Sequence, residues 1–125
     1  MNENEIARVV VDAAIRVHQF LGPGLLEKTY QECLFYELLS RGLRVEKEKF
    51  LPIIYYDIRI EHAFRMDLVV EQKVVVETKS VASLMGIHLA QTLTYLRLGG
   101  YKLGLLMNFN VELMKYGIKR VVNGL

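Results

Sequence analysis

Two valine-rich runs separated by three polar residues constrain the fold of this chain more than any other feature. Residues 65–70 read RMDLVV and residues 74–79 read VVVETK, and both have the composition of β-strands. The polar triplet 71–73 suits a short hairpin loop. If the hairpin is centred on Gln72, Asp67 lies directly opposite Glu77. The sequence therefore predicts two carboxylates facing each other across adjacent strands.

Lys79 is expected on the same face of the sheet as Glu77. Successive strand residues alternate sides, so Val76 and Thr78 are expected to point the other way. Like charges directly opposite each other, with Cβ atoms about 5 Å apart, destabilise a strand pair, and a bound divalent cation would remove that penalty. Solvated salt bridges at a strand end are the alternative. Residues 74–76 favour the site, because carboxylates that end a buried strand are costly unless paired or liganded.

The composition indicates a single globular domain spanning residues 1–125, with 52% hydrophobic residues. A formal charge of +2 and a pI near 8.7 imply that any surface for nucleic acid is local. The one cysteine, Cys33, cannot form an internal disulfide and is expected to be a small core residue. No apolar run approaches about 18 residues, and the start MNENEIARVV is polar and acidic. We therefore expect no membrane span and no secretory signal, and a cytoplasmic location.

Apolar periodicity and turn residues predict three helices and six strands. Asn4 is the expected cap of the first helix, Ser83 is the expected cap of the third, and Gly42 is the expected left-handed end of the second. We expect Leu26, Tyr30, Cys33, Leu34 and Leu38 to form the buried stripe of the second helix. The helices are expected at 4–20, 25–41 and 83–98, and the strands at 44–50, 52–56, 60–70, 74–79, 102–108 and 118–122. Helices on both sides of a cluster of strands predict an α/β or α+β sandwich.

The third predicted helix has two faces. Its apolar stripe, expected to face the sheet, is Met85, Leu89, Leu93 and Leu96. Its polar face carries His88, Gln91 and Tyr95. This face either belongs to the site or is simply solvated. No His or Cys lies at zinc-like spacing. Oxygen ligands instead match magnesium, which would take carboxylates, waters and a substrate phosphate.

Glu27 is the candidate third carboxylate, in the first turn of the second predicted helix. The alternative is that its charge only stabilises the helix N-terminus, which contributes several tenths of a kcal/mol. The residue pattern alone leaves both interpretations open.

Residues 24–30, GLLEKTY, resemble the GxxExxY motif of a family of small bacterial and archaeal proteins. Further segments resemble that family in order along residues 5 to 122. They are Leu38 to Gly42, Tyr55-Tyr56, Arg65-x-Asp67, Val76 to Lys79, Gln91 to Leu96 and Gly104 to Phe109. The family is placed among the PD-(D/E)xK nuclease-like proteins. The resemblance therefore implies a restriction-endonuclease-like core, an α/β fold with a mixed β-sheet flanked by helices.

The resemblance also implies roles for individual residues. Asp67, Glu77 and Lys79 fall on the superfamily motif, and Glu27 falls on its upstream helical acid, so these four are the candidate catalytic residues. The implied metal ligands for Mg²⁺ or Mn²⁺ are Asp67, Glu77 and Glu27. The residues that would position the site or contact the substrate are Gln91, Tyr95, Arg65 and Tyr30. Arg65 is equally expected as a structural partner of Asp67.

The implied activity is metal-assisted hydrolysis of phosphodiester bonds in nucleic acid, with DNA preferred to RNA as the expected partner. Lys79 would orient water or stabilise the charge that develops on phosphate. The alternative is a catalytically silent protein of the same fold that binds nucleic acid or assembles with other proteins. A metabolic enzyme has little support, because the chain has no phosphate-binding glycine loop. The small size favours a homodimer or a protein partner.

Overall fold

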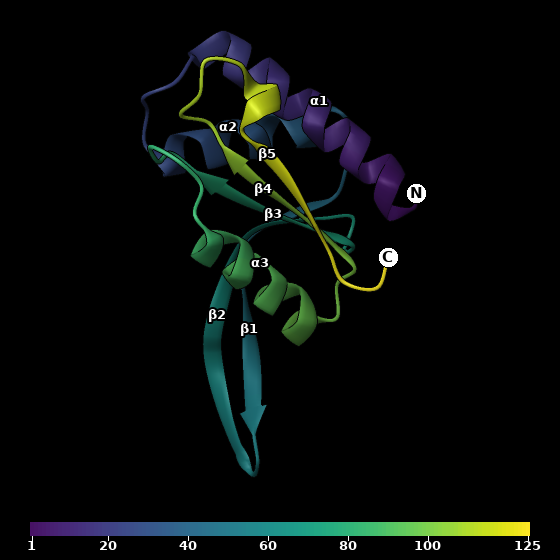
Figure 1. Cartoon of the computed structure of the whole chain (residues 1–125). Helices are drawn as coiled ribbons and strands as arrows, with labels where there is room; N and C mark the ends of the chain where they lie inside the picture. Colours follow the sequence, from purple (N-terminus) through teal and green to yellow (C-terminus); the bar gives the residue numbers. More distant parts are fainter.

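The computed structural model describes all residues from 1 to 125, arranged as a five-stranded mixed sheet with helices on both faces (Figure 1). The strands lie in chain order across the sheet, and all neighbours are antiparallel except β3 and β4, which are parallel. The elements are α1 (Glu3–Leu21), α2 (Glu27–Ser40), β1 (Val45–Tyr55), β2 (Ile58–Val70), β3 (Val74–Lys79), α3 (Gly86–Gly99), β4 (Leu103–Asn108), a 3-10 turn η1 (Met114–Tyr116) and β5 (Ile118–Val122). The predicted α/β fold with a mixed, helix-flanked sheet is confirmed.

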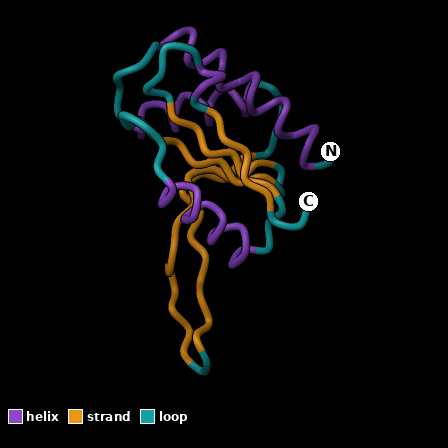
Figure 2. The backbone as a smooth tube through the Cα atoms, in the orientation of Figure 1, coloured by secondary structure: helices purple, strands orange, loops and turns teal.

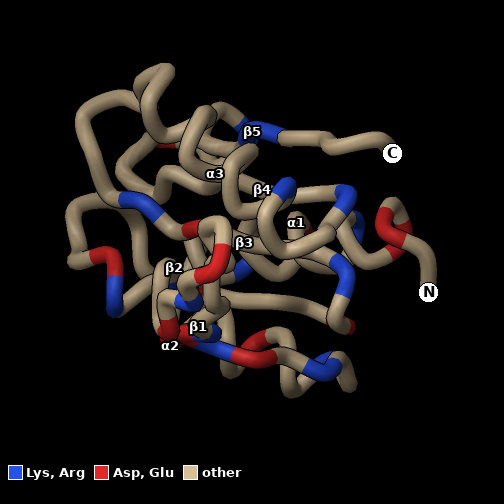
Figure 3. Tube along the Cα trace, turned by 90° about the horizontal axis from the view of Figure 1, so that it is seen from below, with Lys and Arg blue, Asp and Glu red and all other residues tan.

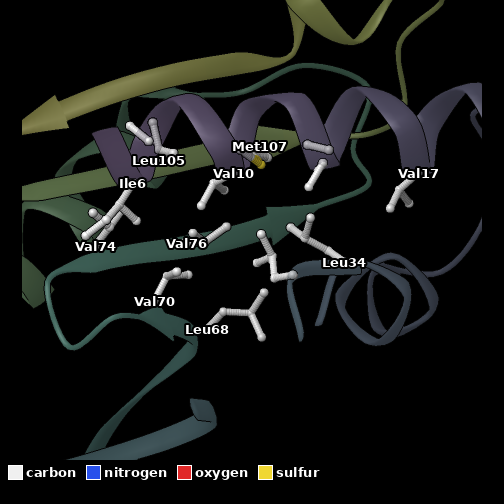
Figure 4. Close-up of a cluster of buried hydrophobic side chains, with 14 of the residues drawn as sticks. Ile6, Val10, Val17, Leu34, Leu68, Val70, Val74, Val76, Leu105 and Met107 are labelled. Carbon is white, nitrogen blue, oxygen red and sulfur yellow. The ribbon is translucent and has the colours of Figure 1, made fainter. Parts of the chain in front are cut away.

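The main core lies between the sheet and the helices α1 and α2, which cover the same face (Figures 1 and 4). Ile6 and Val10 of α1 meet Val74 and Val76 of β3, and all four side chains are fully buried. The prediction that residues 74–76 form a strand buried on both faces is confirmed. This strand therefore fixes the centre of the molecule and the position of the carboxylate that follows it.

The helix ends show why two predictions were wrong. Asn2, not Asn4, caps α1, because its side chain accepts from Glu5 N–H while the Glu5 carboxylate accepts from Asn2 N–H, a reciprocal capping box. Leu26, expected to be buried, is the N-cap of α2 and is 77% exposed. Gly42 has a φ of +84° and ends α2 in a Schellman arrangement, as predicted.

Strands β1 and β2 are longer than the sequence suggested and form a hairpin that projects from the body (Figures 1 and 2). The predicted strands 44–50 and 52–56 are one strand. Pro52 is tolerated because β1 is at the edge of the sheet and the register shifts between Leu51 and Ile53. The third strand β3 pairs with β2 only from Leu68 to Val70, so the outer part of the hairpin has no further neighbour in the sheet.

Helix α3 covers the other face of the sheet alone, and the predicted stripe is confirmed at Leu96 but is wrong at the exposed Met85, Leu89 and Leu93. The buried residues of α3 are Thr92 and Leu96. Gly104 on β4 makes their close contact with the sheet possible. A Cβ there would lie 3.0 Å from Thr92 Cγ2 and 3.2 Å from Leu96 Cδ2, so the missing side chain allows this turn of α3 to approach. Ser83 is not the cap, because α3 begins after Met85.

No helix in the chain combines the length and apolar character needed to cross a membrane.

Candidate active site

The hairpin of β2 and β3 has the predicted register. Leu68 pairs with Val76 and Val70 pairs with Val74, so the register continues to Asp67 opposite Glu77. The backbone ladder ends at Leu68, however, one residue before the two carboxylates. What joins the strands beyond that point is the side chains themselves.

The two carboxylates replace the missing backbone acceptors. The Asp67 N–H donates to Glu77 Oε2 at 2.8 Å, and the Thr78 N–H donates to Asp67 Oδ2 at 2.9 Å. The Thr78 hydroxyl donates to the same Oδ2 at 3.1 Å. Each carboxylate is thus held by the strand opposite its own. This reciprocal bonding orients both groups without a ligand.

The strand is irregular at Asp67, which changes the direction of the Asp67 side chain from the one that strict alternation predicts. Strict alternation would place Met66 and Val69 on opposite faces, yet both pack in the small cluster beneath α3. Glu48, opposite Asp67 in the register of β1, has a φ of +53°. The break in alternation brings the Asp67 carboxylate to Thr78, which the sequence pattern placed facing away.

Burial makes Glu77 the most electrostatically perturbed residue of the site. Its side chain is only 3% exposed, and desolvation, followed by the negative charge of Asp67, raises the pKa of the Glu77 carboxyl to about 8. The hydrogen bond from the Asp67 N–H and the positive charges of Lys79 and Arg65 act in the opposite direction. A bound cation would favour the ionised form, so this environment fits a metal ligand.

Lys79 ends β3, half-buried, with no ion pair within 4.0 Å. Its charge acts on Glu77 nonetheless, lowering the pKa of that carboxyl. Arg65 is exposed, and its ion pair is with Glu48 at 3.4 Å instead of Asp67. The Glu48 carboxylate also accepts from Lys28 at 2.5 Å. Lys79 is therefore the cation that remains available for an anionic substrate.

Helix α3 turns Tyr95 toward the two carboxylates. Burial, then the charges of Glu77 and Asp67, raise the pKa of the Tyr95 phenol, with the Gln91 side chain acting in the opposite direction. The Tyr95 ring stacks on Phe64 of β2 at 4.9 Å between centroids. Gln91 is exposed one turn earlier. His88 accepts the Met85 N–H through Nδ1 and so serves the start of the helix.

Two of the three residues of the GxxExxY motif, Gly24 and Tyr30, have structural roles in the loop before α2. Gly24 has a φ of +94°, which favours glycine. Tyr30 is fully buried. Its hydroxyl donates to the Gly22 carbonyl at 2.6 Å and accepts from the Leu25 N–H at 3.1 Å. Tyr30 thus holds this loop and has no surface for a substrate, so the structure gives it a supporting position.

Glu27, the remaining residue of that motif, is the first residue of α2 and is exposed. The Ser80 hydroxyl donates to the Leu25 carbonyl at 2.6 Å, which docks this loop against the residue that follows Lys79. Glu27 therefore lies at the end of the sheet that carries the site. It does not form a close group with Asp67 and Glu77, because no three His, Cys, Asp or Glu side chains converge as a metal-binding group anywhere in the chain.

Asn108 supports the site and was missed by sequence reasoning. Its buried amide accepts from the Val81 N–H at 3.1 Å and donates to the Val81 carbonyl at 3.0 Å. The Phe109 N–H donates to the Lys79 carbonyl at 2.9 Å. Together these bonds fix the chain on both sides of Ser80. A polar residue that ends the apolar run LGLLM is the signal that could have identified Asn108.

The free oxygens fit a divalent cation. Asp67 Oδ1 and Glu77 Oε1 accept no hydrogen bond from the protein, whereas the other oxygen of each group is held in place. Two oriented carboxylate oxygens are what a hard divalent cation takes from a protein in phosphate chemistry. The donor set present therefore fits a divalent cation with two protein ligands rather than three.

The sheet carries Asp67 on β2 and both Glu77 and Lys79 at the end of the adjacent strand β3. A mixed sheet with these three residues defines a nuclease-like class of α/β protein. A family model described as the PD-(D/E)XK nuclease superfamily matches residues 4–121, and the chain belongs to this superfamily. The fold is accordingly the restriction-endonuclease-like one expected from the sequence. No curated protein and no solved structure gives a significant match.

Proposed function

We propose that this protein is a divalent-metal-dependent nuclease that hydrolyses phosphodiester bonds in nucleic acid. The observation that carries the proposal is the reciprocal bonding of Asp67 and Glu77, which orients two carboxylates while leaving one oxygen of each unpartnered. Membership of the nuclease superfamily supports nuclease-type activity, and its members typically use divalent metals. DNA as the preferred substrate, the narrower GxxExxY assignment and a cytoplasmic location stay predictions.

Each residue has a defined part in the proposed reaction. Asp67 Oδ1 and Glu77 Oε1 would hold Mg²⁺ or Mn²⁺, which when bound polarises a phosphate oxygen and lowers the pKa of coordinated water. Lys79 stabilises negative charge on the reacting phosphate. Glu27 would act through water, since its carboxylate is not grouped with the other two. Tyr95 and Gln91 would position the substrate from α3, and Arg65 would contact its phosphates from β2.

Cleavage of labelled single- and double-stranded DNA and RNA in Mg²⁺, Mn²⁺ or EDTA tests the proposal. Asp67→Asn and Glu77→Gln remove a ligand charge but keep an oxygen that can accept the observed hydrogen bonds, so the fold should survive. We expect both variants to lose metal-dependent cleavage. The control is Glu112→Gln, which neutralises an exposed carboxylate outside the site and should cleave like the wild type.

The alternative function, a silent protein that binds nucleic acid or assembles with others, predicts a different result. Wild-type protein would then bind nucleic acid without cleaving it in any metal, and the two variants would bind equally well. Cleavage that persists unchanged in both carboxylate variants would contradict the proposed mechanism.

A further inference from the structure

The outer part of the β1–β2 hairpin, residues 52–62, forms an arm that no other part of the chain accompanies (Figures 1 and 2). The last side chains of the hairpin that pack beneath α3 are Leu51 and Phe64, at the base of the arm. A two-stranded hairpin without a third strand or a covering helix is marginally stable in water. The arm therefore lacks within this chain the cover that such an element needs.

One face of the arm is apolar throughout. Ile53 pairs with Ile60 and Tyr55 pairs with Ile58, and residues directly opposite each other share a face, as do residues two apart. Arg59 and its partner Ile54 lie on the other face. The alternation of residues 58–61 in β2 is typical of a strand with one buried side, yet Tyr55 is 61% exposed and Ile58 is 53% exposed. The sequence is patterned for a contact that the single chain does not make.

Helix α3 offers a second apolar surface of the same character. Leu89 and Leu93, one turn apart on the flank beside the contact with the sheet, are 38% and 37% exposed. The helix contains no Asp or Glu, and Arg97 is its only Lys or Arg. Depletion of charge in an apolar patch is characteristic of the centre of a protein interface.

We propose that two copies of this chain associate as a two-fold dimer, in which the apolar face of each arm packs on the exposed face of α3 in the other copy. A two-fold axis makes the contact reciprocal, so both unpartnered surfaces of both copies are covered at once. The proposal is independent of the nuclease proposal, because it involves neither carboxylate nor Lys79.

The exposed area is sufficient for such a dimer. Tyr55 is 61% exposed, and with about 150–250 Å² per aromatic side chain it presents roughly 100–150 Å². Ile58 and Ile60 on the arm and Leu89 and Leu93 on α3 bring the apolar area of the two surfaces in each copy to the order of the apolar half of the ~800 Å² per partner that a standard interface buries.

The charge of the arm disfavours nucleic acid as its occupant. Residues 52–62 contain one Arg against one Asp and one Glu, and Arg59 is already paired with Glu61. Seen from below, with the end of the arm toward the viewer, Lys and Arg are interspersed with Asp and Glu near β1 and β2 and form no basic stripe (Figure 3). A surface that follows a phosphate backbone requires an excess of positive charge.

Sedimentation equilibrium at protein concentrations from about 1 to about 100 µM tests the dimer. This range covers the weaker dissociation constants found for interfaces of this size. We expect a mass twice the 14.4 kDa of the chain for the wild type. Ile58→Glu on the arm and Leu93→Glu on α3 should each raise the dimer dissociation constant by at least about tenfold, because each buries a charge in the interface. Phe20→Glu, on a 79% exposed position of α1, is the control and should leave the mass unchanged.

Cross-linking distinguishes this arrangement from other dimers. In a Cys33→Ser background, one batch carries Ile58→Cys and the other carries Leu93→Cys, and a bismaleimide is added to the mixture. We expect the mixed product to exceed either homotypic product. Circular dichroism checks that every variant is folded. A monomeric wild type at all concentrations, a dimer that both glutamate variants leave intact, or predominantly homotypic cross-links would overturn the proposal. If the wild type is monomeric and the Ile58→Glu variant loses nucleic-acid binding, the arm contacts nucleic acid instead of a second copy.

Discussion

At the scale of residues, the burial of Glu77 that suits it to hold a cation also lowers the stability of the cation-free protein. Its folded-state pKa of about 8 lies above its ordinary value of 4.5 because the carboxyl is desolvated and faces Asp67. Between these pH values the folded state holds a proton that the unfolded state has released, so the contribution of Glu77 to stability falls as pH rises. A site arranged to hold a cation is therefore destabilised near neutral pH when none is bound.

The Glu77→Gln variant isolates this effect. In EDTA, the free energy of unfolding of the variant should exceed that of the wild type by an amount that grows from pH 4.5 to about pH 8 and then levels off. Urea denaturation of both proteins across this range measures the difference. A difference that stays constant with pH, or shrinks as pH rises, would contradict the assigned environment of Glu77.

Lys79 is expected to act on the reaction more than on the fold. Lys79→Met keeps most of the side-chain volume and removes the charge, so we expect kcat to fall by about 10²–10³ while metal affinity changes little. The control is Lys102→Met, which removes an exposed charge before β4. Single-turnover cleavage and a metal titration measure the two quantities. An equal loss of metal affinity and turnover would place Lys79 in a supporting role only.

Residue patterns predicted the positions of Asp67, Glu77 and Lys79 because a short hairpin loop fixes the register of its two strands. They could not predict the break in alternation at Asp67, which lies opposite the left-handed backbone of Glu48 in a different strand. The Asp67 bond to Thr78 follows from that break. Contacts that depend on local geometry in a neighbouring element leave no signal in the strand itself.

At the scale of elements, α3 shows how the rule that leucines face the core fails when only one helix covers a sheet. Four leucines recur along this helix, but Gly104 selects the turn of Thr92 and Leu96 for close approach. Leu89 and Leu93 lie on the flank beside that contact and stay 38% and 37% exposed. The strand lengths of β1 and β2 were underestimated for a related reason, since nothing in their residues marks where the hairpin leaves the body.

The same packing of α3 places Tyr95 near the site, which gives a prediction at this scale. Tyr95→Phe keeps the stacking on Phe64 and removes the hydroxyl near the carboxylates. We expect turnover to fall about tenfold, the equivalent of one lost hydrogen bond of about 1.4 kcal/mol, with the melting temperature nearly unchanged. Tyr36→Phe, on an exposed position of α2, is the matched control. Unchanged kcat and KM in Tyr95→Phe would show that the Tyr95 hydroxyl takes no part in the reaction and that this face of α3 has only a structural role.

At the scale of the whole molecule, the arm and the body are separable. Replacing residues 54–59 by Asn-Gly would join the paired residues Ile53 and Ile60 through a two-residue turn. Because no removed residue belongs to either buried cluster, we expect cooperative unfolding with a melting temperature within a few degrees of the wild type. Calorimetry measures this. Loss of a cooperative transition would show that the arm is part of the folding unit.

The hairpin between β2 and β3 imposes a different condition on sequence change. Its loop uses Glu71 and Gln72 with φ of +53° and +58°, and the separation of ten positions between Asp67 and Glu77 must be kept for the carboxylates to meet. In the arm, a change of length would alter only the proposed contact between copies. Among chains descended from a common ancestor, insertions and deletions should therefore be tolerated at the arm and purged between the carboxylates, so that the mode of association diversifies while the chemistry is inherited unchanged.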